Sequence, residues 1–207
     1  MCMPATAPPP QLSWELAPLF PAQGEWTEGD YLALAPDRRV ELSDARVEVL
    51  PVVTQGHQDA SLCFYRALYA FADANGLGKT TVAPMRVRLW PGKIREPDVV
   101  FMLAENAHKV GDRYWDGADL AVEVVSEDDP ERDLQTKRNE YAQAGIREYW
   151  IIDPRDKTVQ LLTLEPGAAA FTLVGRYGLG QTAASKLLDG FAVDLSALFA
   201  GAYFTRT

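Results

Sequence analysis

The chain has 207 residues, of which 47% are hydrophobic, a length and composition that suit a single domain with a sizeable core. Its 29 acidic residues outnumber its 20 basic residues and give a net charge of −9, which argues against non-specific coating of nucleic acid. Two cysteines cannot form a disulfide framework or a complete zinc site. The N-terminus lacks a signal-peptide pattern and no apolar run reaches membrane-spanning length, so we expect a cytoplasmic protein without membrane contact.

The proline-rich N-terminus predicts a flexible arm over residues 1–25, followed by one domain over residues 26–207. The first half of that domain predicts a short helix, a hairpin, a long helix and two strands. In chain order we expect these elements at 31–34, 39–50 with a turn at 43–45, 57–75, 80–90 and 97–103. The buried stripe of the long helix is expected to contain Leu62, Tyr65, Leu68, Tyr69, Phe71 and Ala72.

The second half predicts further strands around one more helix. In chain order we expect a polar loop at 105–119, a strand at 119–126, a helix at 130–144, strands at 148–152, 159–164 and 171–174, and an extended piece with a short helix at 187–199. Asp129 as N-cap, Pro130 at the first helical position and Gly145 after the last turn mark the ends of the helix. The order of elements favours an α/β fold with a mixed central sheet and two long helices.

One residue conflicts with its surroundings, and that residue is Glu123 in the middle of the apolar strand 119–126. Leucine, alanine and valine make up most of this strand, so both of its faces are expected to be buried. A buried carboxylate is costly unless a cation, a metal ion or several hydrogen bonds compensate its charge. The sequence therefore predicts a strongly paired or functional carboxylate at this position.

Asp98, at the mouth of the strand 97–103, offers a second carboxylate on a neighbouring strand. Hydrolysis of a phosphodiester at neutral pH needs charge neutralisation on the phosphate and a generated hydroxide, and one or two Mg²⁺ or Mn²⁺ ions supply both. Two carboxylates on adjacent strand ends and a lysine that holds the attacking water would form a minimal set, and the backbone carbonyl of Val124 is a candidate third metal ligand. Asp98 on its own also fits a simple strand cap, so the hypothesis depends on its pairing with Glu123.

Several motifs resemble those of known nucleases. Pro97-Asp98 followed by Glu123-Val124-Val125 is similar to the core of the PD-(D/E)XK nucleases, except that Val125 stands where that pattern has lysine. The wider pattern resembles the Uma-two family of restriction-endonuclease-like nucleases of bacteria, over roughly residues 26–200. The further motifs that carry this likeness are Glu41-Leu42-x-Asp44, His57, Asp133-x-x-x-Lys137-x-x-x-Tyr141 and Glu148-Tyr149-Trp150-Ile151-Ile152-Asp153-Pro154.

The resemblance implies a restriction-endonuclease-like fold and places the catalytic lysine on the helix after the Glu123 strand, at Lys137. Helical geometry permits this placement, because Lys137 lies three residues after Leu134 and four before Tyr141. Those two residues are expected to face the sheet, so Lys137 would share their inward face. The alternative is an exposed ion pair between Lys137 and Asp133, four residues apart on one helix.

Auxiliary site roles are predicted for three residues, each with a structural alternative. Glu41 completes a second metal site or positions water, or it is an ordinary solvent-facing strand residue. His57 contacts phosphate or water, or it caps and packs the start of its helix. Tyr141 fits core packing better than catalysis. The family usually has glycine and proline where this chain has Ala45 and Glu127, and neither change removes a proposed metal ligand.

The one basic cluster near Asp98 contains Arg86, Arg88, Lys93 and Arg95, and it is predicted to contact phosphates, with a solvated strand edge as the alternative. The chain has no helix-turn-helix pattern, zinc finger or contiguous basic stripe. The substrate is therefore predicted only as nucleic acid, with DNA preferred. Apolar strands towards the C-terminal end predict a homodimer or a higher homo-oligomer.

Two function classes follow from these observations. The first is an endonuclease that uses Mg²⁺ or Mn²⁺, in which Asp98 and Glu123 bind the metal ion and Lys137 assists the attacking water. The second is a non-catalytic binding or assembly module on the same fold that retains an acidic pocket. The net charge of −9 and the valine at position 125 favour the second class. The buried Glu123, with Asp98 and Lys137 in matching positions, favours the first, which is our prediction.

Overall fold

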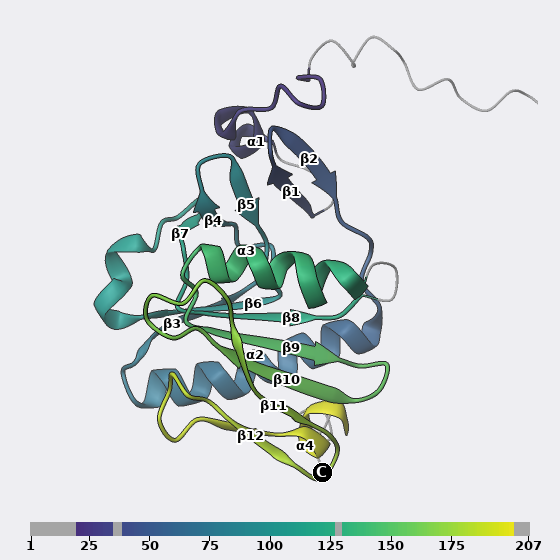
Figure 1. Ribbon diagram of the computed structural model, residues 1–207, viewed down its shortest axis with the longest axis vertical. Coiled ribbons are helices and arrows are strands. Elements are labelled where there is room, and N and C mark those ends of the chain that lie inside the picture. Colours follow the sequence, from purple (N-terminus) through teal and green to yellow (C-terminus); the bar gives the residue numbers. More distant parts are fainter. Residues whose placement is uncertain (1–19, 35–38, 127–129, 201–207) are drawn as a thin grey trace, which may run out of the picture.

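The computed structural model describes residues 20–34, 39–126 and 130–200. A six-stranded sheet forms the centre, and a smaller five-stranded sheet lies above it in the view of Figure 1. The helices are α1 (Glu28–Ala33), α2 (Gln55–Ala74), α3 (Lys137–Gln143) and α4 (Leu195–Ala200). The strands are β1 (Val40–Ser43), β2 (Arg46–Val49), β3 (Gly78–Val82), β4 (Val87–Trp90), β5 (Lys93–Arg95), β6 (Val99–Leu103), β7 (Trp115–Asp116), β8 (Leu120–Val124), β9 (Glu148–Asp153), β10 (Thr158–Thr163), β11 (Thr172–Tyr177), β12 (Thr182–Ala184) and β13 (Ala192–Asp194).

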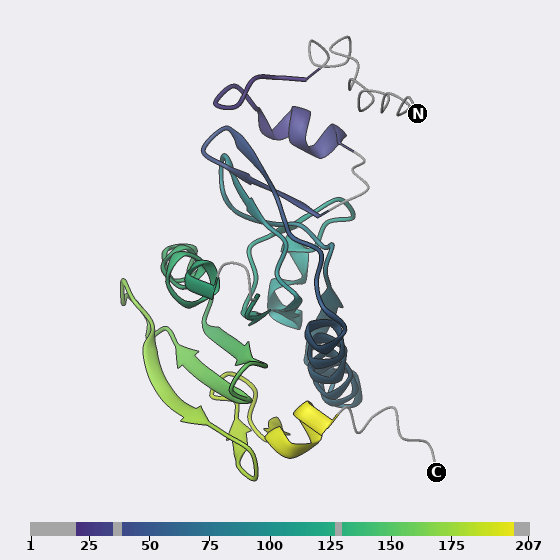
Figure 2. The ribbon, with the colours of Figure 1, turned by 90° about the vertical axis from the view of Figure 1, so that its right-hand side faces the viewer.

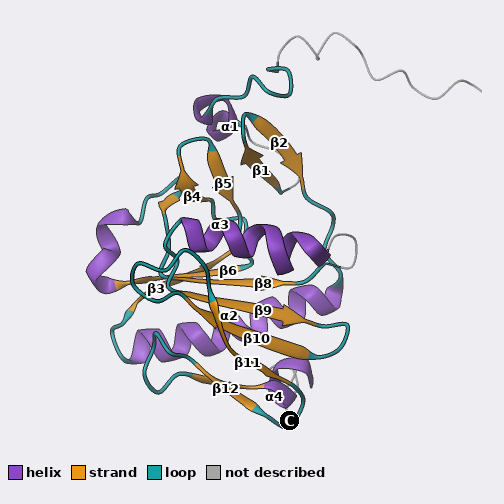
Figure 3. Cartoon of the chain, viewed as in Figure 1, coloured by secondary structure: helices purple, strands orange, loops and turns teal. Residues whose placement is uncertain are grey.

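The central sheet has the strand order β11-β10-β9-β8-β6-β3 (Figure 3). Neighbouring strands in it run antiparallel except for β8 and β9, which run parallel. Parallel neighbours need a crossover connection, and α3 supplies it here. The sheet is therefore mixed, and the predicted α/β class is confirmed.

The two faces of the central sheet are covered by different helices, with α2 on one side and α3 on the other (Figure 2). Successive residues of a strand point to opposite faces. In β8, Val122 and Val124 pack into the core on the α2 side, whereas Ala121 and the next residue after the strand, Val125, pack into the core on the α3 side. Alternation therefore turns the side chain of Glu123 towards α3.

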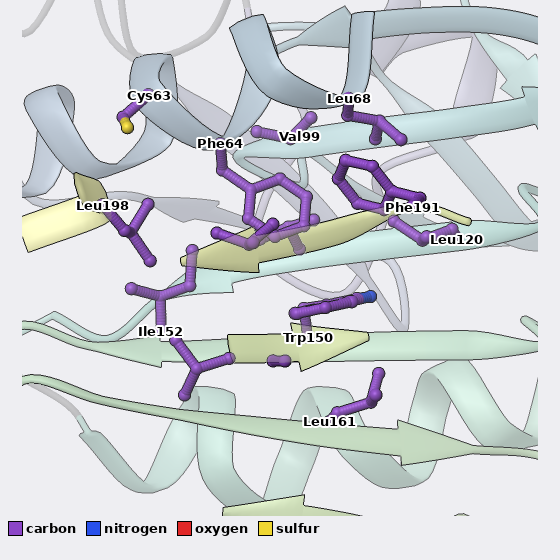
Figure 4. Packing of buried hydrophobic residues seen from close by; sticks show 14 of the residues in the cluster. Cys63, Phe64, Leu68, Val99, Leu120, Trp150, Ile152, Leu161, Phe191 and Leu198 are labelled. Atoms are coloured by element: carbon purple, nitrogen blue, oxygen red, sulfur yellow. The ribbon is translucent and has the colours of Figure 1, made fainter. Parts of the chain in front are cut away.

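The core between α2 and the sheet is centred on Phe64, whose ring meets Trp150 and Phe191 at centroid distances of 5.1 and 5.9 Å (Figure 4). Leu68 extends this core by one helical turn and is fully buried, as predicted. The predicted burial of Tyr69 is wrong, because that side chain is 47% exposed. Tyr69 is the residue after Leu68, and one residue turns a helix by about 100°, which carries its side chain away from the sheet.

The smaller sheet has the strand order β2-β1-β5-β4-β7. The predicted hairpin is present, and its turn residues Asp44 and Ala45 have φ values of 52° and 58°, as a type I′ turn requires. The strand predicted at 80–90 is instead two strands, β3 and β4, which belong to different sheets. Pro84 lies between them and cannot donate to a strand ladder, which accounts for the break. The loop predicted at 105–119 contains a 3₁₀ helix (Ala104–Lys109) and β7.

Several further predictions concern the ends of elements. Gly145 follows the last turn of α3 with a φ of 77°, as predicted. The N-cap prediction for Asp129 and the arm over residues 1–19 lie outside the described residues. Within the rest of the predicted arm, the Gln23 side chain exchanges two hydrogen bonds with the Val47 backbone, at 3.0 and 2.9 Å. In the described part of the chain, no helix is long and apolar enough to cross a membrane.

Candidate active site

A pocket of about 410 Å³ lies at the start of β6 and the adjacent end of β8. The β2–α2 connection, the start of α2 and the segment that leads into α3 complete its lining. Its inner part is charged, and residues 49–53 supply an apolar wall. The lining residues are Arg39, Val49, Leu50, Pro51, Val53, His57, Asp98, Glu123, Val124, Ser126, Arg132, Asp133 and Lys137. Its volume is within the range of small-molecule and cofactor sites.

Glu123 is held by two side chains from α3. It is 1% exposed, and alternation along β8 directs it to the α3 face. The Tyr141 hydroxyl donates a hydrogen bond to Oε1 at 2.5 Å, and Lys137 Nζ lies 3.0 Å from Oε2. The compensation expected for a buried carboxylate is therefore present as one cation and one hydrogen bond. Tyr141 is also fully buried in the core under α3, so its predicted packing role is confirmed.

Asp98 lies beside Glu123 because β6 and β8 are neighbours in the sheet. The two strands are antiparallel, with Val99 opposite Val122, so the residue before β6 comes opposite Glu123. The backbone amide of Val124 donates to Asp98 Oδ2 at 2.9 Å. This contact fixes the aspartate against the end of β8 and leaves the two carboxylates on adjacent strands of one pocket.

Two cationic or polar side chains hold Asp98 from the other side. His57 lies in the first turn of α2, where the Thr54 side chain caps the helix by accepting from the His57 amide at 3.2 Å. Its Nε2 is 3.1 Å from Asp98 Oδ2. Arg39 Nη1 donates to Asp98 Oδ1 at 2.9 Å, and its Nη2 donates to the Glu96 carbonyl. No sequence pattern pointed to Arg39, since an arginine at the start of a predicted strand has no diagnostic spacing.

Lys137 reaches inward from the first position of α3, directly after a π-helical turn, Arg132–Thr136. The amide of Lys137 donates to the Arg132 carbonyl five residues back, as this turn type requires. The lysine side chain is 5% exposed, and Nζ lies 3.0 Å from Glu123 Oε2 and 3.1 Å from Asp133 Oδ1. The structure therefore places Lys137 inward, as predicted, and the pair with Asp133 is buried rather than exposed.

Four buried carboxylates surround this one lysine, and their charges control the local pKa values. Burial raises the pKa of Glu123 to about 8, and the charges of Asp98 and Asp133 add to the rise while Lys137 opposes it. Burial alone would lower the pKa of Lys137, but the carboxylates raise it above its usual range, so the lysine stays a cation. Burial also opposes ionisation of Asp98, yet its interactions with His57 and neighbouring cations hold its pKa well below the usual range.

Residues 29–196 match the Uma2 (Uma-two) family, whose description is "Putative restriction endonuclease". The chain belongs to the Uma2 family. Its structure is similar to one described as "a putative nuclease belonging to DUF820 from Anabaena variabilis ATCC 29413", with a TM-score of 0.65 and 14% sequence identity over 84% of this chain and 98% of that chain. No curated protein matches. The structural likeness shows the fold alone, and it confirms the predicted restriction-endonuclease-like architecture.

In this Uma2-family chain, Glu41 is fully buried and lies outside the pocket lining. Its Oε1 accepts from the Glu96 amide at 2.9 Å, and its Oε2 accepts from Arg95 at 2.9 Å and from Arg132. Lys137 Nζ is 3.9 Å from Oε1. Burial opposes its ionisation, but the charges of Lys137, Arg95 and Arg132 lower the pKa of Glu41 to about 2. The alternative of a solvent-facing strand residue is therefore wrong.

The arginines predicted to contact phosphates are not brought to the pocket. Arg95 is 2% exposed, and its guanidinium donates to three carboxylates. Arg88 bonds to Asp116 at 3.1 Å, and Arg86 lies over the Tyr31 ring at 4.6 Å from its centroid. These three side chains have intramolecular partners and do not line the pocket, so the structure does not bring them to the candidate site. The arginines that do line the pocket are Arg39 and Arg132.

The proposed metal ligands of this Uma2-family chain keep acceptor capacity. An ionised carboxylate has about four lone-pair sites, and a bound divalent cation would favour the ionised form of Glu123 over the protonated form that burial favours. Three contacts, from Val124, His57 and Arg39, engage Asp98, and two engage Glu123. Among the described residues, no group of three or more His, Cys, Asp or Glu could hold a metal ion. Mg²⁺ is usually bound by one or two carboxylates, with water and substrate phosphates completing its shell, so the residues fit Mg²⁺ or Mn²⁺ bound in that open manner.

Proposed function

We propose that this Uma2-family protein is an endonuclease that uses Mg²⁺ or Mn²⁺ to hydrolyse phosphodiester bonds of nucleic acid, with DNA as the preferred substrate. The observation that carries the proposal is the pair of buried carboxylates, Asp98 and Glu123, on adjacent strands of one pocket with Lys137 Nζ 3.0 Å from Glu123. Burying these charges is costly, and a purely structural ion pair would not require a pocket at the same place.

Asp98 and Glu123 would hold the metal ion together with the Val124 carbonyl. A bound divalent ion supplies charge neutralisation on the phosphate and lowers the pKa of water. Lys137 remains protonated, so it acts by donating a hydrogen bond to the attacking water and by stabilising negative charge, not by taking a proton. Tyr141 holds the orientation of Glu123 through the hydroxyl bond at 2.5 Å.

A cleavage assay with matched variants tests this proposal. Purified protein is incubated with labelled single-stranded DNA, duplex DNA or RNA in Mg²⁺, Mn²⁺ or EDTA, beside Asp98→Asn, Glu123→Gln and Lys137→Met. Glu105→Gln is the control, because it also removes one acidic charge but its side chain is 72% exposed. We expect metal-dependent cleavage by wild type and the control, and loss by about 10²-fold or more in the three site variants. Equal cleavage in all samples would identify a contaminating nuclease and reject the proposal.

A non-catalytic binding module is the second candidate function. It is favoured by the valine at position 125 and by the small number of metal-binding side chains, since no three-ligand group occurs in the described residues. Calorimetry with Mn²⁺ separates the two candidates. Binding that Asp98→Asn abolishes favours the endonuclease, whereas no binding at millimolar Mn²⁺ favours the module. The predicted homo-oligomer and the cytoplasmic location remain predictions from the sequence.

A further inference from the structure

Two arginines share the lining of the pocket with the candidate catalytic residues. Among the described residues that line it, the cationic side chains are Arg39, Arg132 and Lys137. The Lys137 side chain is 5% exposed, whereas those of Arg39 and Arg132 are each 22% exposed. An anion that enters the pocket would therefore meet the two guanidinium groups before it meets the lysine.

Arg39 is oriented by hydrogen bonds to Asp98 and to the backbone of Glu96. Its Nη1 donates to Asp98 Oδ1 at 2.9 Å and its Nη2 donates to the Glu96 carbonyl. Its Nε is 3.6 Å from Glu96 Oε2 and makes no hydrogen bond. A guanidinium has five N–H donors, so these contacts hold the group in place and leave donors for a ligand.

Arg132 is oriented in a similar way by the smaller sheet. Its Nη2 donates to Glu48 Oε2 at 2.6 Å and to Glu41 Oε2. Glu41 and Glu48 are paired directly opposite each other in the β1–β2 hairpin. Arg132, from the segment before α3, therefore contacts both carboxylates. Lys137, the first residue of α3, follows five residues further along the chain.

A guanidinium held by carboxylates is a preorganised phosphate ligand. Its planar fork matches the oxygens of a phosphate, and its orientation is fixed before the ligand arrives, which reduces the entropy lost on binding. The same pocket has an apolar wall formed by Val49, Leu50, Pro51 and Val53. Such a wall suits the sugar and base faces that adjoin a phosphate.

We propose that Arg39 and Arg132 form the phosphate-binding subsite of this pocket, where Arg39 contacts the phosphodiester beside Asp98 and Arg132 contacts a neighbouring phosphate of the same strand. The inference rests on the proposed function, because it takes nucleic acid as the ligand. It assigns to Arg39 and Arg132 the role that the sequence had suggested for Arg86, Arg88 and Arg95.

The salt dependence of binding tests this subsite without requiring cleavage. Fluorescence anisotropy of a short fluorescein-labelled oligonucleotide, single-stranded or duplex, is measured in EDTA and in Ca²⁺ over a series of salt concentrations, and a gel confirms that the probe stays intact. The variants are Arg39→Gln, Arg132→Gln and Arg39→Lys. Arg88→Gln is the matched control, because it also removes one positive charge but its side chain does not line the pocket.

We expect each glutamine variant to reduce the slope of log K against log salt by about 0.7 for a single strand or 0.9 for a duplex, the contribution of one phosphate contact. Each should also weaken binding at low salt by about tenfold, as loss of a charge-assisted hydrogen bond does. Arg39→Lys keeps the positive charge but loses the planar guanidinium group, so this variant should bind the oligonucleotide several-fold more weakly with an unchanged slope. The control should match wild type.

Several outcomes would overturn the inference. Wild-type slopes in both glutamine variants, a control that loses as much slope as they do, or no binding by wild type would each do so. If Arg39→Gln does not fold, as judged by thermal melting, then Arg39→Lys with wild-type affinity would exclude Arg39, and Arg132→Gln tests the second contact independently. Reduced slopes without metal-dependent cleavage would reject the nuclease and retain the subsite. Cleavage that depends on Glu123 together with unchanged slopes would do the reverse.

Discussion

The buried carboxylate of Glu41 is the point at which a single substitution should most clearly show how much the buried ion pairs contribute to stability. Glu41→Gln keeps the shape of the side chain and removes its charge. In the wild-type protein this charge compensates Arg95, which is 2% exposed, and Arg132, whose Nη2 donates to the same Glu41 oxygen. Glutamine would instead direct an amide towards these donors or lose one of the contacts, and Arg95 would keep only its other carboxylate partners.

The magnitude follows from the pKa of the buried group. The pKa of Glu41 falls from its usual 4.5 to about 2, because Lys137, Arg95 and Arg132 outweigh the effect of burial. A shift of this size corresponds to about 3 kcal/mol of stability, at about 1.4 kcal/mol for each pKa unit. Breaking a buried ion pair by removing one partner costs a similar amount, about 3–5 kcal/mol. We therefore expect Glu41→Gln to lower the free energy of unfolding by about 3 kcal/mol near neutral pH and the melting temperature by roughly 10 °C.

The pH dependence identifies the source of that loss. Because the folded-state pKa lies below the unfolded-state pKa, the contribution of Glu41 is complete above pH 4.5 and disappears as the pH falls through 2. The cations that face Glu41 stay charged over this range. Glu96 also faces it, and burial raises the pKa of Glu96 to about 7, so the comparison is best made below that value.

Urea denaturation of wild type, Glu41→Gln and the exposed control Glu165→Gln supplies the measurement. The difference between wild type and Glu41→Gln should shrink from about 3 kcal/mol near pH 6 to about 2 kcal/mol near pH 3.5, while the control stays within about 0.5 kcal/mol of wild type. A difference below about 1 kcal/mol near pH 6, or one that does not change with pH, would refute the ion-pair reasoning.

Three further substitutions test other parts of the structure. Lys137→Met leaves Glu123 and Asp133 without their cation, so we expect cleavage to fall by about 10²–10³-fold, together with a lower melting temperature in thermal scans; unchanged rates would exclude Lys137 from the chemistry. Tyr141→Phe removes the hydroxyl that donates to Glu123 at 2.5 Å and should cost about 1–3 kcal/mol in urea denaturation. Gly78→Ala should destabilise the fold by about 3 kcal/mol or more, because a Cβ there would lie 2.0 Å from a backbone carbonyl oxygen of β6 and the residue has a φ of 154°; wild-type stability would contradict this packing.

Local patterns predicted those parts of the fold that depend on one segment. The apolar composition of β8 predicted that Glu123 is buried, and the turn at Asp44 and Ala45 has the positive φ values that a two-residue hairpin needs. The buried face of α2 was predicted less well. Aromatic residues such as Tyr69 satisfy the apolar period, but only the position of the sheet decides which neighbouring stripe is covered.

The site was predictable where its residues come from short, spaced motifs, and unpredictable where two sheets meet. Asp98 and Glu123 could be paired from the order of strands, and helical spacing placed Lys137 on the inward face. The contact between Arg132 and Glu41 joins residues 91 positions apart, and it forms only because the smaller sheet docks against the segment before α3. No periodicity within one element reports such a contact, which is why the sequence did not point to the arginines that line the pocket.

The absence of lysine at position 125 now has a physical explanation. Val125 is 1% exposed and packs with Tyr141 in the core beneath α3, so a lysine there would have to displace apolar packing to reach Glu123. Lys137 approaches the same carboxylate from the helix, and the π-helical turn before α3 is the local feature that carries its backbone into position. Val125 therefore packs in the core, and Lys137 supplies the positive charge from α3. The position of the ammonium group relative to the two carboxylates, not the sequence position of the lysine, is therefore what the proposed chemistry requires.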